Sequence, residues 1–283
     1  MPAQAGRTPL VAAMVCLLAG LQAGCAPLLI FNPTLRQMAE ARRNPLPTAA
    51  PQDAIELEVF FIERPGDDPR LGESMWTHLD QIGSVDAATR QRLTENGLRF
   101  GLAGQSLPYG LQALLSDIVD QGPGRRTQRQ VYQTPSGVTH QFPSGDLPNP
   151  VVIRLHTDDG IREREYLHSR GVIRCRATRT QAGWAELEVL PEIHHGQMKM
   201  RPIATEQNWN WSGRQEIEPH YSQRFRVTLN QGDLLVLSAV GEQVDSLGNR
   251  MFRTGESGEP IERLLVIRVR SLNQVEGVLQ GER

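Results

Sequence analysis

The stretch VIRCRATRTQAGWAELEVL, residues 172–190, decides the fold of this chain. Apolar and charged side chains alternate on both sides of a turn at residues 181–183, a pattern typical of two antiparallel strands in a hairpin. An even register gives the hairpin one buried face, formed by Ile173, Cys175, Leu187 and Val189. It places opposite charges side by side on the other face, from Arg174, Arg176, Glu186 and Glu188. Burial of the apolar face fixes this register, because a shift by one residue would turn every side chain over.

Five further stretches around this hairpin alternate with the same period of two residues. They are residues 151–156, 161–168, 224–229, 234–240 and 264–269. Short, turn-like connections join them and no convincing helical pattern lies between them, which favours an antiparallel β-sandwich or open barrel. We predict this β domain over residues 151–272, followed by a tail at residues 273–283.

Residues 54–122 have a different pattern, which predicts a small α/β domain. A strand signal begins at Ile55, two helical signals and a second strand follow, and an apolar face over residues 111–119 indicates a further helix. A Gly-Pro-Gly sequence at residues 122–124 interrupts the pattern, so residues 123–150 are predicted to be a linker. The predicted fold class is therefore α+β, with a small α/β domain followed by an antiparallel β-sandwich or open-barrel domain.

The charge balance and the cysteines exclude two classes of protein. The 283 residues have a formal net charge of −2 at pH 7, so the chain lacks the basic field that nucleic acid binding requires. Of the three cysteines, Cys16 and Cys25 lie near the N-terminus, which leaves Cys175 alone in the folded part. A framework of intramolecular disulfides is therefore excluded, and we predict that Cys175 is a small buried apolar residue.

Residues that could carry catalytic chemistry have simpler explanations. His156, Asp158 and Asp159 lie at the end of a predicted strand and could form a metal site or a general base, but Asp-Asp-Gly is also typical of a hairpin turn, which we favour. His194 and His195 are adjacent, so on a strand they point to opposite faces and do not easily share a metal ion. No nucleophile elbow, phosphate-binding loop or zinc-binding helix motif occurs. We predict a protein that is not an enzyme, with no catalytic residue, metal or cofactor.

Two groups of residues are candidates for binding. Trp209 and Trp211 lie in a polar segment, where their rings could stack on a sugar or on an apolar side chain of a protein; alternatively, one indole packs into the sheet edge and orders the loop. Arg125 and Arg126, with Arg129 nearby, form a basic patch just after the predicted boundary. This patch is either a solvated face of the linker or a contact for anionic headgroups or glycans.

The N-terminus has a short basic start followed by an apolar run. Arg7 precedes an uncharged, apolar stretch at residues 9–21, and small Ala23 and Gly24 come directly before Cys25. In these features the first 25 residues resemble a bacterial lipoprotein signal. The apolar run is shorter than the roughly 20 residues that a membrane-spanning helix needs.

The lipoprotein resemblance implies how the N-terminus is processed. Residues 1–24 would be removed as a signal peptide, and Cys25 would carry the lipid. The proline-rich residues 25–53 would then form a spacer between the membrane and the folded part. An ordinary secretory signal cut near Ala23 or Ala26, or a membrane helix, is the alternative.

Three runs in the second half of the chain together form a further recognisable pattern. They are WAELEVLPEI, RFRVTLNQGDLLVL and RLLVIRV, at residues 184–193, 224–237 and 263–269. With Leu247-Gly248 and Phe252, they make residues 172–270 similar to the C-terminal β-module of bacterial secretins, the ring-forming channels of the outer membrane. The resemblance implies a β-module and an envelope scaffold, and it does not extend to segments that would line a pore.

These features together predict a non-catalytic, lipid-anchored protein of the bacterial cell envelope, facing the periplasm or the exterior. Its partners would be the membrane, through the N-terminal lipid, and a protein or glycan that its loops contact; a homo-oligomer is an open alternative. One alternative function is a lipid-anchored hydrolase of an envelope polymer, with carboxylates such as Asp158 or Asp159 in a cleft. Another is a secretin-like, ring-forming component of a secretion system.

Overall fold

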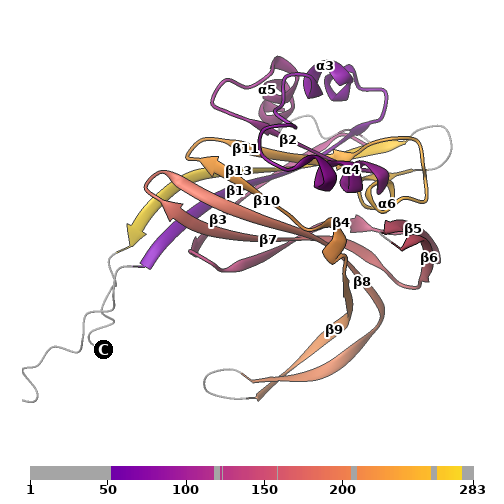
Figure 1. Cartoon of the computed structure of the whole chain (residues 1–283). Coiled ribbons are helices and arrows are strands. Elements are labelled where there is room, and N and C mark those ends of the chain that lie inside the picture. Colours follow the sequence, from indigo (N-terminus) through magenta and orange to yellow (C-terminus); the bar gives the residue numbers. More distant parts are fainter. Residues whose placement is uncertain are drawn as a thin grey trace, which may run out of the picture. The chain divides into compact units, whose positions relative to one another are not determined.

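Figure 1 shows the computed structural model of the chain, which describes residues 52–117, 122, 124–157, 159–204, 209–255 and 260–275. These residues belong to one compact unit. Its strands form two large antiparallel sheets and one small one. The structure is therefore a mostly β, sandwich-like fold with a few helices, in agreement with the predicted fold class.

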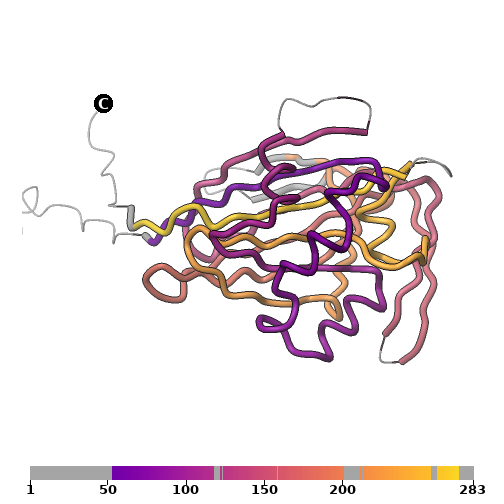
Figure 2. Tube along the Cα trace, turned by 90° about the horizontal axis from the view of Figure 1, so that it is seen from above, coloured from indigo at the N-terminus to yellow at the C-terminus, as the bar shows by residue number. Residues whose placement is uncertain are grey.

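The first sheet, sheet A, has the strand order β2-β11-β13-β1-β3, and β12 pairs with β13. Its strands are β1 (Gln52–Pro65), β2 (Leu98–Ala103), β3 (Arg126–Pro135), β11 (Leu234–Ala239), β12 (Arg253–Thr254) and β13 (Ile261–Val275). Strand β1 lies inside this sheet, where it pairs with β13 on one side and with β3 on the other. The first described strand and the last one are therefore neighbours, and Figure 2 shows the indigo trace of β1 beside the yellow trace of β13.

The second sheet, sheet B, has the order β10-β8-β7-β4, and β9 pairs with β8. Its strands are β4 (Thr139–Asp146), β7 (Arg170–Gln181), β8 (Trp184–Ala204), β9 (Trp209–Pro219) and β10 (Phe225–Asn230). A separate two-stranded sheet consists of β5 (Val151–Thr157) and β6 (Gly160–Tyr166).

The helices are short. They are η1 (Pro69–Leu71), α3 (Glu73–Trp76), α4 (Ala87–Glu95), α5 (Tyr109–Ser116), η2 (Tyr221–Gln223) and α6 (Leu247–Phe252). Helix α4 begins after Asp86, because the Asp86 carboxylate accepts a hydrogen bond from the backbone N–H of Thr89 at 2.9 Å. It ends before Gly97, whose φ of 73° lies in the left-handed region that favours glycine.

The main hydrophobic core lies between sheets A and B. Leu57 and Val59 of β1 are fully buried there, as are Leu187 and Val189 of β8. They are alternate residues of their strands, because successive side chains of a strand point to opposite faces. Cys175 is fully buried in the same core, which confirms the prediction, and this burial raises the pKa of its thiol to about 12.

Helices cover the other face of sheet A (Figure 1). Phe60 and Ile62 of β1 pack there against Trp76 of α3 and against Leu111 and Leu114 of α5. Sheet A is therefore buried on both faces at its centre. This explains why β11 has the sequence LLVLSA, in which every residue is buried, instead of alternating apolar and polar residues.

The β7–β8 hairpin has the predicted even register. Cys175 lies opposite Val189, and Arg176 lies opposite Glu188. The ion pairs themselves differ from the prediction, because Glu188 binds Arg226 of β10 at 2.6 Å. Burial of the apolar face thus decides the register, as expected.

The chain segments on either side of the predicted boundary at residue 122 share one sheet. Strands β1 and β2, from residues 54–122, pair with β13 and β11, from residues 151–272. The predicted linker, residues 123–150, contains β3 and β4. The sequence of β3, RTQRQVYQTP, has polar residues on both faces, so the apolar alternation on which the prediction relied is absent there.

We expect Leu57→Ala to lower the free energy of unfolding by about 2–5 kcal/mol, because it leaves a cavity in a packed core. Since β1 joins both halves of the chain in one sheet, the whole protein should unfold in a single, shifted transition. Urea unfolding followed by circular dichroism measures both quantities. The control Ile161→Ala, at a side chain that is 61% exposed, should change the free energy by less than about 0.5 kcal/mol. Two transitions, of which Leu57→Ala moves only one, would contradict the shared sheet.

Candidate functional site

The β8–β9 hairpin continues beyond sheet B. Strand β8 has 21 residues, but its pairing with β7 extends only to His194. Further along, within the described part of the chain, β8 pairs only with β9. We call this extension, residues 197–204 and 209–215, the arm. Figure 1 shows the arm projecting away from the two sheets.

The base of the arm is fixed by its backbone and by one side chain. The pairing of β8 with β9 shifts between His195 and Lys199, and Gly196 in this bulge has a φ of 78°. The amide of Gln215 donates hydrogen bonds to the carbonyl oxygens of His168, at 2.6 Å, and of Gly196, at 3.1 Å. These bonds tie the base of the arm to the turn between β6 and β7.

One face of the arm is apolar and exposed. Met198 is 70% exposed, Met200 62% and Trp211 63%. The two methionines are two residues apart, and Trp211 lies opposite Pro202, two residues further on, so all three side chains share one face. Gly213 lies between them, where a Cβ atom would come within 2.8 Å of the Met198 sulfur. We call Met198, Met200 and Trp211 the arm face.

The other face of the arm is charged. Lys199 lies opposite Arg214 in the pairing of β8 with β9. The Lys199 ammonium forms an ion pair with Glu216 at 2.8 Å, and both side chains are exposed. The arm therefore has one charged, well-solvated face and one apolar, poorly solvated face.

The two predicted tryptophans thus lie on a strand, β9, and not in a loop. The side chain of Trp209 is outside the described part of the structure. Trp211 is exposed, so it does not pack into the sheet edge. The sequence prediction missed Met198 and Met200; their alternation with charged Lys199 was the available signal, and it becomes informative only when the pairing with β9 is known.

The three predicted arginines separate. Arg125 is exposed and directly precedes β3. Arg126 is the first residue of β3 and lines a cavity, whereas Arg129 lies on the opposite face of sheet A. Arg129 forms an ion pair there with buried Glu58, whose other carboxylate oxygen binds Arg268 at 3.0 Å. The predicted basic patch is therefore not a single surface.

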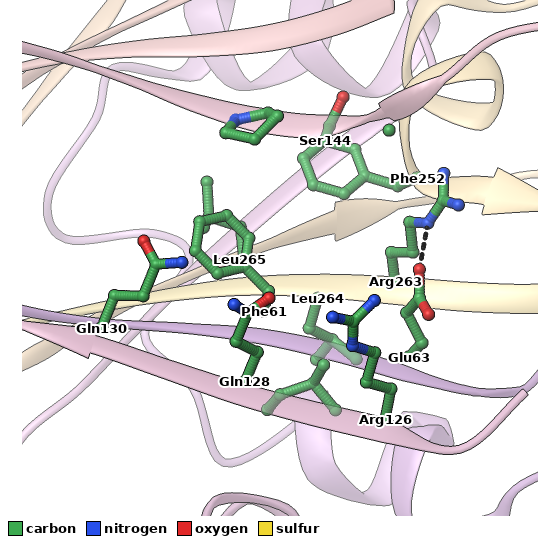
Figure 3. Close-up of a pocket in the computed structure, with 13 residues that line it drawn as sticks. Phe61, Glu63, Arg126, Gln128, Gln130, Ser144, Phe252, Arg263, Leu264 and Leu265 are labelled. Atoms are coloured by element: carbon green, nitrogen blue, oxygen red, sulfur yellow. Dashed lines mark hydrogen bonds and ion pairs between the residues drawn. The ribbon is translucent and has the colours of Figure 1, made fainter. Parts of the chain in front are cut away.

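The cavity beside Arg126 has a volume of about 210 Å³ and lies between the edge strands of the two sheets, β3 and β4 (Figure 3). Its lining residues are Phe61, Ile62, Glu63, Arg126, Gln128, Gln130, Pro143, Ser144, Gly145, Phe252, Arg263, Leu264 and Leu265. An ion pair lies at one end, where the Nε of Arg263 donates a hydrogen bond to Glu63 at 2.9 Å. The cavity thus combines apolar walls with a few charged groups.

A buried polar cluster lies on the face of sheet B away from the main core. The Glu192 carboxylate, which is 1% exposed, lies 3.1 Å from Arg174 and 3.1 Å from His194. His195 lies on the opposite side of the strand, with its ring 5.1 Å from that of Tyr166, so the adjacent histidines do point to opposite faces. His220 precedes η2, and burial lowers the pKa of its ring to about 4.

The predicted acidic candidate Asp159 lies at a hairpin turn. The backbone of His156 is held by Asn96, whose side-chain oxygen accepts its N–H at 2.9 Å. Thr157 then pairs with Gly160 at the end of the β5–β6 hairpin. The Asp159 carboxylate forms an exposed ion pair with Arg162 at 2.8 Å, and Asp158 lies outside the described residues. Asp159 and Gly160 therefore lie in an exposed turn at the end of this hairpin.

Comparisons with known protein families, with curated proteins and with solved structures found no match to this chain. The roles of the arm and of the cavity are therefore inferred from their geometry alone. Among the helices of the described ranges, none is long and apolar enough to cross a bilayer.

His220 should make the stability of the protein depend on pH. Burial lowers the pKa of its ring from the ordinary 6.5 to about 4. Between these values the unfolded chain takes up a proton that the folded state does not, so the free energy of unfolding falls as the pH falls. From pH 7 to pH 5 this residue should account for a loss of about 2 kcal/mol, measured by urea unfolding at each pH.

The variant His220→Gln keeps a polar side chain and should remove most of this loss. The matched control is His78→Gln, at an exposed position, which should leave the pH dependence unchanged. If His220→Gln lost as much stability as the wild type between pH 7 and pH 5, the assignment to His220 would be wrong.

Proposed function

We propose that this chain is a non-catalytic, lipid-anchored protein of the bacterial envelope, and that its arm binds a protein partner. The observation that carries the proposal is the arm face, in which Met198, Met200 and Trp211 are all mostly exposed. Contiguous apolar side chains on a surface are unfavourable in water, and they typically mark a site that a partner covers.

The composition of the arm face favours a protein over a glycan. Tryptophan and methionine are enriched at protein interfaces, where tryptophan is a frequent hot spot and methionine adapts to irregular apolar surfaces. A glycan site would place hydrogen-bonding groups beside the ring, whereas the described side chains near Trp211 on this face are two thioethers, with Gly213 between them. We therefore infer a partner that offers an apolar groove.

The charged face of the arm supports a one-sided contact. Lys199 and Glu216 form an exposed ion pair with each other, so water solvates this face well when no other protein is bound. A partner that covers only the arm face would bury the three apolar side chains and leave these charges in water. The arm would thus insert one face against its partner.

The anchor is inferred from the resemblance of the first 25 residues to a lipoprotein signal, and Cys25 lies outside the described part of the chain. The two alternative functions stay predictions. The carboxylate of Asp159 is paired on the surface, and the secretin-like ring rests on sequence runs alone.

Labelling with a clickable fatty acid tests the anchor. Wild-type protein should take up the label in bacterial cells, and Cys25→Ser should lose it while the chain is still exported, because serine offers no thiol. The matched control Cys16→Ser should label like the wild type, since its thiol lies within the apolar run. Equal labelling of wild type and Cys25→Ser would reject the lipid anchor.

Photocrosslinking in cells tests the arm. A photoreactive p-benzoylphenylalanine in place of Trp211 should give a discrete product with a second protein, because the arm face would lie in the interface. The double substitution Met198→Ser, Met200→Ser should weaken this product, since it removes the apolar neighbours.

The matched control carries the same photoreactive residue in place of Ile161, an exposed apolar side chain on β6. It should not give that product. A product that contains two copies of this chain would show that the arm contacts a second copy in a homo-oligomer and not a different protein. The same products from both positions, or none from position 211, would contradict a binding role for the arm.

A further inference from the structure

The first part of the inner face of β3 is polar where a sandwich would normally be apolar. Gln130 lies opposite Val59 of β1, and Gln128 lies opposite Phe61, so these glutamines share the face of β1 that packs toward sheet B. Arg126 continues the same face, two residues before Gln128. Arg126 and Gln128 are exposed at this edge and Gln130 is partly buried, so the space between the edge strands is not closed by apolar side chains and stays open as the cavity.

The other walls of the cavity are mostly apolar, apart from Ser144 and the ion pair of Glu63 with Arg263. Phe61 and Leu265 come from the central strands of sheet A, Pro143 from β4 and Phe252 from the end of α6. Figure 3 shows Arg126, Gln128 and Gln130 reaching across from β3 toward the side of the cavity formed by Ser144 and Phe252. A ligand in this space would meet apolar walls along its length and polar groups along one side.

One of the two arginines at the cavity has no carboxylate that neutralises its charge among the lining residues. Glu63 lies opposite Arg263 on one neighbouring strand and opposite Arg126 on the other. The carboxylate of Glu63 binds Arg263, and among the described residues no hydrogen bond or ion pair involves the guanidinium of Arg126. One carboxylate between two arginines leaves a net charge of +1, which a monoanion would neutralise.

The backbone of β4 makes room at the charged end. The pairing of β4 with β7 shifts between Pro143 and Gly145, and Gly145 has a φ of 145°. A Cβ atom on Gly145 would lie 2.0 Å from the Nη1 of Arg263, so no other residue fits without displacing that arginine. Glycine therefore keeps Arg263 in place beside the cavity.

We propose that this cavity binds a small amphipathic monoanion, with an aromatic or short aliphatic body against Phe61, Phe252 and Leu265 and a carboxylate at Arg126. Its volume of about 210 Å³ lies below the roughly 300–1,000 Å³ of pockets for drug-sized molecules, which limits the body to one ring or a short chain. Arginine suits the anionic group because its guanidinium can form two parallel hydrogen bonds with a carboxylate. The site is independent of the arm.

Isothermal titration calorimetry with 3-phenylpropionate tests the proposal. The carboxylate should bind the full-length protein with one site, and its neutral analogue 3-phenylpropanamide should bind at least about tenfold more weakly, because it lacks the charge that Arg126 pairs with. Equal affinity for both compounds, or no saturable binding of the carboxylate, would overturn the proposal.

Two arginine variants locate the anion site. Arg126→Gln should weaken binding of 3-phenylpropionate about tenfold, while Arg125→Gln, the adjacent exposed arginine outside the cavity, should bind like the wild type. Methyl NMR should show shifts for Leu265 on titration and none for Leu167, which is exposed at the turn after β6. Unchanged affinity in Arg126→Gln, or an unshifted Leu265, would place the ligand elsewhere and refute the site.

Discussion

The position of β1 inside sheet A is the constraint on which the rest of the structure depends. Val59 faces the core shared with sheet B, and Phe60 faces the core under the helices, so one strand contributes to both apolar layers. At the end of β1, fully buried Arg64 donates a hydrogen bond to Thr127 of β3 at 2.9 Å and lies 3.4 Å from the carboxylate of Asp117, just after α5. A single strand therefore ties the helical layer and both sheets together.

Much of this architecture was accessible from the sequence, because burial imposes a period that can be read. The β7–β8 hairpin was predicted with its register, since Cys175 and Val189 alternate with charged residues and only one pairing buries them together. Strands β3 and β4 were missed because their inner positions are partly polar, as at Gln128. The pairing of β1 with β13 was out of reach for a different reason, since local alternation indicates that a strand exists and not which strand lies beside it.

The candidate sites show the same limit. Trp211 could be singled out because tryptophan in a polar segment is unusual, but Met198 and Met200 became relevant only when β8 and β9 were seen to place them on the same face. Arg126 was predicted as part of a basic patch with Arg125, although the two residues lie in different surroundings. Residue type and local pattern thus identified single candidate residues. Which of them lie together in the structure depends on the strand pairing, which the local sequence does not specify.

The order of the strands also affects how the polypeptide is made. Glu58 of β1 and Arg268 of β13, which form an ion pair, are 210 residues apart. The ribosome synthesises β1 early and β13 near the end, so β1 cannot pair with β13 until nearly all of the chain has emerged. Pairing over such a distance is slow, so the side of β1 that faces β13 stays unpaired until β13 has been synthesised. Sheet A therefore cannot close before its last strand has left the ribosome.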